Sequence, residues 1–94
     1  MQNTLLEDSI MSGEQTITVY GTKWCPDCHR ARRVLDGRDI PYTYIDIHRD
    51  KQACTYVEQV NHGNRSVPTI QFPDGEILVE PSRRALNAKL DTLK

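Results

Sequence analysis

The sequence lacks a long apolar run and an excess of charge of either sign. No stretch approaches the roughly 20 apolar residues that cross a bilayer, and no basic flank precedes an apolar segment near the N-terminus. We therefore expect a protein that has no membrane contact and stays in the cytoplasm. The formal net charge is -1, without the basic surplus that neutralises a run of phosphates. The charge balance argues against a nucleic-acid-binding protein.

Cysteine is also scarce, which excludes a scaffold held together by disulfides. Of the 3 cysteines, two stand in the run Cys25-Pro26-Asp27-Cys28, a spacing too tight to join distant loops. A second pair at this spacing is missing, so a zinc site would have to combine Cys54 with His29, His48 or His62 at unfamiliar spacings. Since thiols are kept reduced in a cytoplasmic protein, we expect the close pair to cycle between dithiol and disulfide, with no bound metal or cofactor.

The chain is long enough for one hydrophobic core only. It has 94 residues, of which 37% are hydrophobic and 27% are charged, a balance typical of a small globular domain. Residues 1–14 hold few apolar side chains and end near Ser12-Gly13, so we expect a flexible N-terminal extension, with Met11 as an alternative start. The predicted domain spans residues 15–94.

Hydrophobic periodicity and turn residues predict seven elements in the order β-α-β-α-β-β-α. These are a strand at 16–20, a helix at 26–36, a strand at 42–47, a helix at 50–61, strands at 67–72 and 76–79, and a helix opened by Pro81-Ser82 and carrying Leu86, Leu90 and Leu93. The first two strands should be parallel because a helix joins them, and the last two antiparallel because a tight turn joins them. The sequence thus predicts an α/β fold with a four-stranded mixed sheet and three helices.

The two cysteines of the close pair are predicted to be inequivalent. Cys25 precedes Pro26, which is tolerated at a first helical position, so Cys25 caps the helix. The free amides and positive end of the helix stabilise a thiolate there, and Lys23 adds a positive charge nearby. Cys28 lies one turn inward on the apolar face and should be enclosed and closer to its ordinary protonation. We therefore expect Cys25 to attack a disulfide and Cys28 to resolve the intermediate.

Three other residues allow two interpretations each. Asp27 either serves the helix dipole or opposes the thiolate of Cys25 by its charge. Trp24 is either an exposed substrate contact or a packing residue of the loop. Cys54 lies at the edge of a helical stripe and is expected to be a small buried hydrophobe rather than a third redox thiol.

Residues 22–28, Thr-Lys-Trp-Cys-Pro-Asp-Cys, with Ser66-Val67-Pro68-Thr69 further on, resemble the glutaredoxin branch of the thioredoxin superfamily over roughly residues 16 to 93. The stretch from Val60 to Thr69, with Phe72-Pro73-Asp74-Gly75 and Pro81-Ser82, looks most like the mycoredoxin-type glutaredoxins of actinobacteria. The resemblance implies a thioredoxin fold, a cis Pro68, and a Val67 backbone that pairs with substrate as a short added strand. The expected substrate-binding residues are Lys23, Trp24, Pro26, Asp27, Val67, Pro68 and Ser82.

The sequence also departs from the family pattern. Glutaredoxins usually have Tyr or Phe where Asp27 stands, and many have Gly-Gly and an acidic residue before the last helix, where this chain has Val79-Glu80-Pro81-Ser82. Ser82 could still offer a hydroxyl and helix-end amides to an anionic group. The expected donor is mycothiol or glutathione, or a flavoprotein reductase in a thioredoxin-like role.

The expected activity is thiol-disulfide oxidoreduction by a monomer. Its partners would be proteins with disulfides, or proteins in mixed disulfides with a small thiol. The alternative is a binding module that holds zinc or an iron-sulfur cluster through Cys25.

Overall fold

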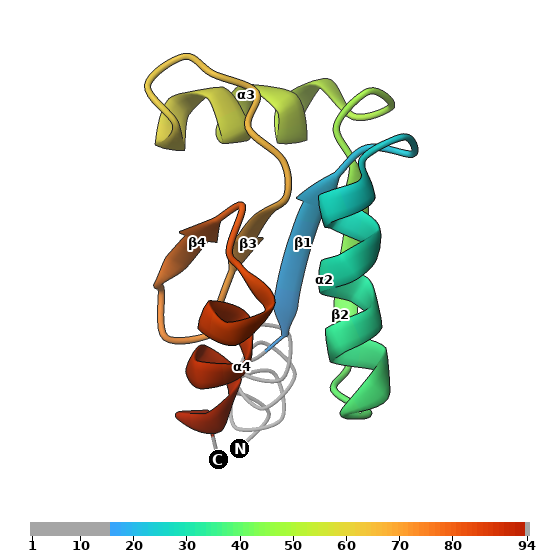
Figure 1. Cartoon of the computed structure of the whole chain (residues 1–94). Coiled ribbons are helices and arrows are strands. Elements are labelled where there is room, and N and C mark those ends of the chain that lie inside the picture. The colour runs from blue at the N-terminus through green and yellow to red at the C-terminus, as the bar shows by residue number, and fades with distance from the viewer. Residues whose placement is uncertain (1–15, 94) are drawn as a thin grey trace, which may run out of the picture.

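The computed structural model describes residues 16–93, so the predicted extension at residues 1–14 lies outside the described part. The elements follow one another as β1 (Ile17–Gly21), α2 (Pro26–Gly37), β2 (Tyr42–Asp46), α3 (Lys51–Val60), β3 (Thr69–Gln71), β4 (Ile77–Val79) and α4 (Arg83–Asp91) (Figure 1). The predicted order is confirmed. None of the helices in this part of the chain is long and apolar enough to span a bilayer.

The strands form one mixed sheet in the order β2-β1-β3-β4. β1 and β2 are parallel, with Val19 opposite Tyr44 and Gly21 opposite Asp46. β3 runs antiparallel to β1, and β4 runs antiparallel to β3. The parallel pair requires the α2 crossover, which returns the chain to the end of the sheet at which β1 begins. The carboxyl end of β1 therefore leads directly into the helix that carries both cysteines.

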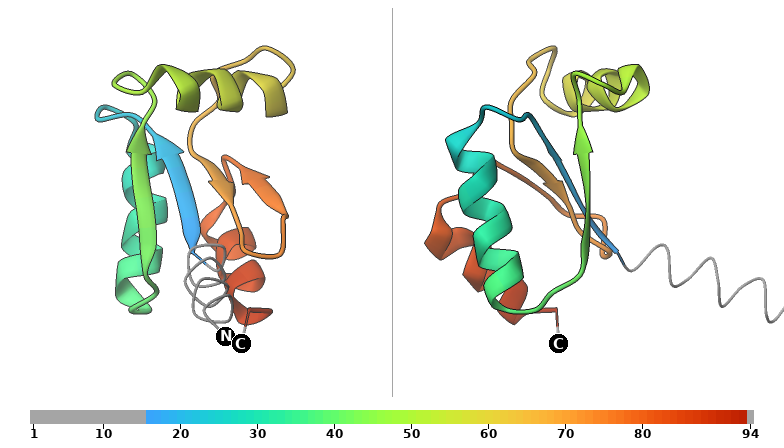
Figure 2. Two further views of the ribbon diagram at one scale, coloured as in Figure 1. Left: turned by 180° about the vertical axis from the view of Figure 1, so that it is seen from behind. Right: turned by 90° about the vertical axis from the view of Figure 1, so that its right-hand side faces the viewer.

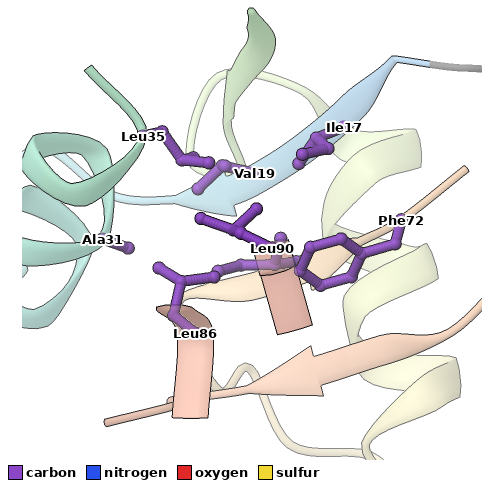
Figure 3. Close-up of a cluster of buried hydrophobic side chains, with 8 residues drawn as sticks. Ile17, Val19, Ala31, Leu35, Phe72, Leu86 and Leu90 are labelled. Carbon is purple, nitrogen blue, oxygen red and sulfur yellow. The ribbon is translucent and has the colours of Figure 1, made fainter. Parts of the chain in front are cut away.

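The helices cover both faces of the sheet. α2 and α4 lie on one face and α3 on the other (Figure 2). The α2 and α4 face holds the main core, in which alternate strand residues meet the apolar stripes of the two helices (Figure 3); its buried members are Ile17, Val19, Ala31, Leu35, Ile70, Phe72, Leu86 and Leu90. A smaller cluster of Ile47, Ala53 and Val57 seats α3 on the opposite face. The core thus fixes α2, and with it the cysteine pair.

One predicted strand is too long. The sequence pattern predicts a strand at 67–72, but β3 begins only at Thr69. Proline has no backbone N–H to donate to a strand ladder, so only the Pro68 carbonyl continues the pairing past β4, accepting the Glu80 N–H at 2.8 Å. Residues 67 and 68 therefore form a loop at the end of the sheet, beside the turn between β1 and α2 (Figure 1).

Candidate active site

Cys25 caps α2, as its position before Pro26 predicts. Its backbone is extended, and its sulfur accepts the Cys28 backbone N–H at 3.1 Å. The first turn of a helix leaves its amides without intrahelical partners, so a sulfur in this position receives both a hydrogen bond and the positive end of the helix dipole. The side chain is half-buried and reaches the surface. Cys25 is thus placed as an accessible thiol at the positive end of the helix dipole.

Cys28 is enclosed, as its place on the apolar face of the helix predicts. Its side chain is fully buried on the inner face of α2. Burial raises the pKa of its thiol to about 12, and the hydrogen bond with Cys25 adds to this effect, while a hydrogen bond from the Thr22 backbone opposes it. The pKa of Cys28 therefore lies above the ordinary value that the sequence predicts, because an apolar site disfavours the charged thiolate. The two thiols differ more than their positions in the sequence suggest.

The loop before β3 faces Cys25 from the other side. The Val67–Pro68 peptide bond is cis, as the resemblance implies, and Pro68 is buried. The Cys25 thiol donates to the Val67 carbonyl oxygen at a sulfur-to-oxygen distance of 3.7 Å. The Val67 N–H has no hydrogen-bond partner within residues 16–93. The structure thus brings Cys25 beside the Val67–Pro68 loop, which lies about forty residues later in the sequence.

Residues 23, 24 and 27 lie at the rim of the site. Trp24 is 82% exposed, which rules out the packing interpretation and leaves its ring free for contact. Lys23 is exposed as well, and its carbonyl oxygen lies 3.0 Å from Nε2 of His29. Asp27 makes an ion pair with Arg30 one turn later, at 2.9 Å. Arg30 therefore partly neutralises the charge of Asp27 at the rim of the site.

Ser82, a predicted contact, and Cys54, predicted to be a buried hydrophobe, make no hydrogen bond with Cys25 or Cys28. The Ser82 hydroxyl caps α4 by accepting the Ala85 N–H at 3.0 Å, and no hydrogen bond joins it to Cys25. Cys54 is half-buried, less enclosed than predicted, with its sulfur 4.0 Å from a Glu58 carboxylate oxygen. Within residues 16–93 no three histidine, cysteine or acidic side chains gather to hold a metal ion.

Sequence reasoning missed Thr69, which fixes the cis-proline loop. Thr69 is completely buried, and its hydroxyl donates to the Ser66 carbonyl at 2.7 Å and accepts from the Asn61 side chain at 3.1 Å. These bonds tie the loop to the end of α3. A polar residue directly after Pro68, at the start of a buried strand, was the available signal, because buried hydroxyls need partners.

Sequence reasoning also missed a tight contact under Cys28. A Cβ atom on Gly21 would lie 2.8 Å from the Cys28 sulfur and 2.8 Å from the Tyr44 hydroxyl oxygen. Only glycine allows these two groups to approach the end of β1 so closely.

We expect Gly21→Ala to destabilise the domain by about 1–3 kcal/mol, because the added methyl group forces Cys28 and Tyr44 out of well-packed positions. Urea unfolding followed by circular dichroism measures the effect. Gly37→Ala is the matched control, since a Cβ there would meet nothing within 4 Å and alanine suits a helix. Equal stability of Gly21→Ala and the wild type would contradict the packing described.

An accessible helix-capping thiol, a buried thiol one turn inward and a facing cis-proline loop on this sheet define a thiol-disulfide oxidoreductase of the thioredoxin fold. The family model for glutaredoxin matches residues 17–78. The chain belongs to the glutaredoxin family, and the resemblance seen in the sequence is confirmed.

Named relatives and solved structures agree with this assignment. A Mycobacterium tuberculosis protein that bears the name glutaredoxin is 42% identical over 74 residues, which cover 79% of this chain and 88% of that protein. Mycoredoxin 1 of Corynebacterium glutamicum is 39% identical over 77 residues, covering 82% and 95%. The glutaredoxin structure from Archaeoglobus fulgidus superposes with a TM-score of 0.63 at 23% identity, covering 89% of this chain and 90% of that one. This last similarity supports the fold alone.

Proposed function

We propose that Cys25 is the attacking thiolate and Cys28 the resolving thiol in the reduction of protein disulfides and of mixed disulfides with a small thiol. The observation that carries this assignment is the contrast between the two sulfur atoms. Cys25 is half-exposed and accepts an amide hydrogen bond at the helix N-terminus, whereas Cys28 is fully buried. Only Cys25 can meet a bulky disulfide, and only Cys28 is placed to reach Cys25 from within.

The proposed reaction has two exchanges. The Cys25 thiolate attacks one sulfur of the substrate disulfide, and the other sulfur leaves with the bonding electron pair and takes up a proton. Cys28 then loses its proton and attacks the Cys25 sulfur, which releases the second substrate thiolate and leaves a Cys25–Cys28 disulfide. The substrate gains two electrons and the protein loses two. A thiol donor then reduces the Cys25–Cys28 disulfide by the same two exchanges in reverse order.

The substrate surface would combine the rim of the site with the cis-proline loop. The free Val67 N–H can pair with an extended segment beside Cys25, in the manner of an added strand. Trp24 offers an exposed aromatic face next to the reacting sulfur, and Lys23, Pro26 and Asp27 border it. We keep Ser82 as an outer contact for an anionic group, through the amides at the start of α4.

Membership of the glutaredoxin family implies a thiol co-substrate and partners with disulfides or thiols. Among small thiols we propose mycothiol rather than glutathione. The relatives named mycoredoxin support this choice, as does the run Val79-Glu80-Pro81-Ser82 in place of the usual glycine-rich segment. Turnover with each thiol, and with a flavoprotein reductase, separates the three donors. We also propose a cytoplasmic location, where a thiol pool keeps the pair reduced.

We expect Cys28→Ser to separate the two substrate classes. Reduction of a protein disulfide should fall by about tenfold or more, because only a thiol from solution can then release Cys25. Turnover of a mixed disulfide with a small thiol should persist when that thiol is in excess. Coupled turnover assays with both substrates measure the split, and Cys54→Ser is the matched control. Equal loss toward both substrates would contradict the resolving role, and metal bound by the purified protein would favour the alternative of a zinc or iron-sulfur module.

A further inference from the structure

Tyr44 lies under the active site and is held on two sides. It stands on β2 beside β1, with the Arg32 guanidinium carbon 4.1 Å from its ring centroid. Its ring also lies within 3.1 Å of where a Gly21 Cβ would stand. A ring held between a cation and a backbone has little freedom to turn. The Tyr44 hydroxyl is therefore fixed in direction, and it donates to the Thr22 carbonyl oxygen at 2.9 Å.

The backbone at Gly21 and Thr22 contacts both cysteines. The Thr22 carbonyl oxygen accepts the Cys25 N–H at 3.4 Å, in addition to the Tyr44 hydroxyl. One residue earlier, the Cys28 sulfur packs on the chain 2.8 Å from where a Gly21 Cβ would stand. Of the two hydrogen bonds that the Thr22 carbonyl accepts, the one from Tyr44 is the shorter and therefore the stronger. The Gly21–Thr22 backbone thus links Tyr44 to both cysteines.

We propose that the Tyr44 hydroxyl is a positioning group that favours the reduced form of the pair. It holds the Thr22 carbonyl that accepts the Cys25 N–H, next to the Gly21 backbone on which the Cys28 sulfur packs. The contacts described belong to the dithiol state, since all three cysteines are free. Formation of a disulfide draws the Cys28 sulfur toward Cys25 and away from its packed position on the Gly21 backbone. The contacts that Tyr44 supports therefore stabilise the dithiol more than the disulfide.

This inference rests on the proposed function only in requiring that Cys25 and Cys28 form a redox couple. The relevant equilibrium transfers two electrons and two protons from a reference dithiol to the protein disulfide, which gives the protein dithiol and the reference disulfide. Tyr44 contacts no substrate in this proposal and takes no direct part in the thiol-disulfide exchange. Its effect should appear in the position of the equilibrium rather than in the identity of the attacking sulfur.

Tyr44→Phe tests the proposal without removing the ring. The phenylalanine ring still fits between Arg32 and Gly21, so packing is kept while the hydrogen bond to Thr22 is lost. The variant and the wild type are equilibrated in buffers of lipoic acid and its dithiol, and the reduced fraction is read by thiol alkylation and mass spectrometry. One hydrogen bond of ordinary net strength predicts a shift of about three- to tenfold toward the disulfide.

Tyr42→Phe is the matched control. Tyr42 lies two residues earlier on β2, and its hydroxyl donates to Asp36 at 3.0 Å and accepts from Arg32 at 3.3 Å. Its loss disturbs the same arginine but leaves Thr22 bonded, so we expect an equilibrium within about twofold of the wild type. Circular dichroism verifies that both variants are folded.

An unchanged equilibrium in folded Tyr44→Phe would overturn the positioning role while leaving the redox function intact. An equal shift in Tyr42→Phe would overturn it too, by assigning the effect to Arg32. A wild type that forms no Cys25–Cys28 disulfide would overturn both the inference and the proposed function.

Discussion

Cys25→Ser should reduce disulfide exchange by at least about a thousandfold, to the background rate of the reaction in solution. A serine hydroxyl does not ionise near neutral pH, so the helix N-terminus has no nucleophile to stabilise. Cys28 cannot take over the attack, because it is fully buried and its pKa is raised to about 12 by burial and by its bond with Cys25. Turnover of a mixed disulfide under excess thiol measures the loss.

Cys54→Ser is the matched control for this experiment. Cys54 is half-buried on α3, with its sulfur 4.0 Å from a Glu58 carboxylate oxygen. No hydrogen bond joins it to Cys25 or Cys28. Its replacement should leave the rate within about twofold of the wild type. Substantial activity in folded Cys25→Ser, or a large loss in Cys54→Ser, would contradict the assignment of the attacking thiol.

Leu35→Ala should lower the free energy of unfolding by about 2–5 kcal/mol. Leu35 is fully buried where α2 packs on β1, in the main core that holds the cysteine helix in place. Truncation removes buried methyl groups and leaves a cavity that neighbours fill only in part. Since a small domain is stable by about 5–15 kcal/mol in all, this is a large fraction. Urea unfolding at equilibrium measures the change.

Val79→Ala provides the comparison for Leu35→Ala. Val79 is 40% exposed at the end of β4, so we expect a change within about 0.5 kcal/mol. A Leu35→Ala variant as stable as Val79→Ala would show that α2 is not seated by this core.

The parts of the fold that could be predicted from sequence are those set by local pattern. The α2 stripe of Cys28, Ala31 and Leu35 repeats at helical spacing, and all three residues are buried. The predicted strand at 67–72 is longer than β3 because the pattern of side chains does not show that the backbone ladder begins only at Thr69. The pattern of side chains thus predicts element type better than element ends.

The same distinction applies to the site. The roles proposed for Cys25 and Cys28 follow from their spacing and from Pro26, which are local features. Tyr44 could not be found this way, because its contact with Thr22 depends on the register of β2 against β1 across 22 residues of chain. The high pKa of Cys28 likewise depends on burial, which the sheet and α2 produce together.

The central claim is that Cys25 attacks and Cys28 resolves, and trapping the intermediate tests it most directly. Cys28→Ser is incubated with one equivalent of an oxidised small thiol, and the modified cysteine is located by peptide mass spectrometry. Our account predicts a single adduct on Cys25, since it is the accessible thiol at the helix N-terminus, with Cys54 unmodified. An adduct on Cys54 with Cys25 free would contradict it.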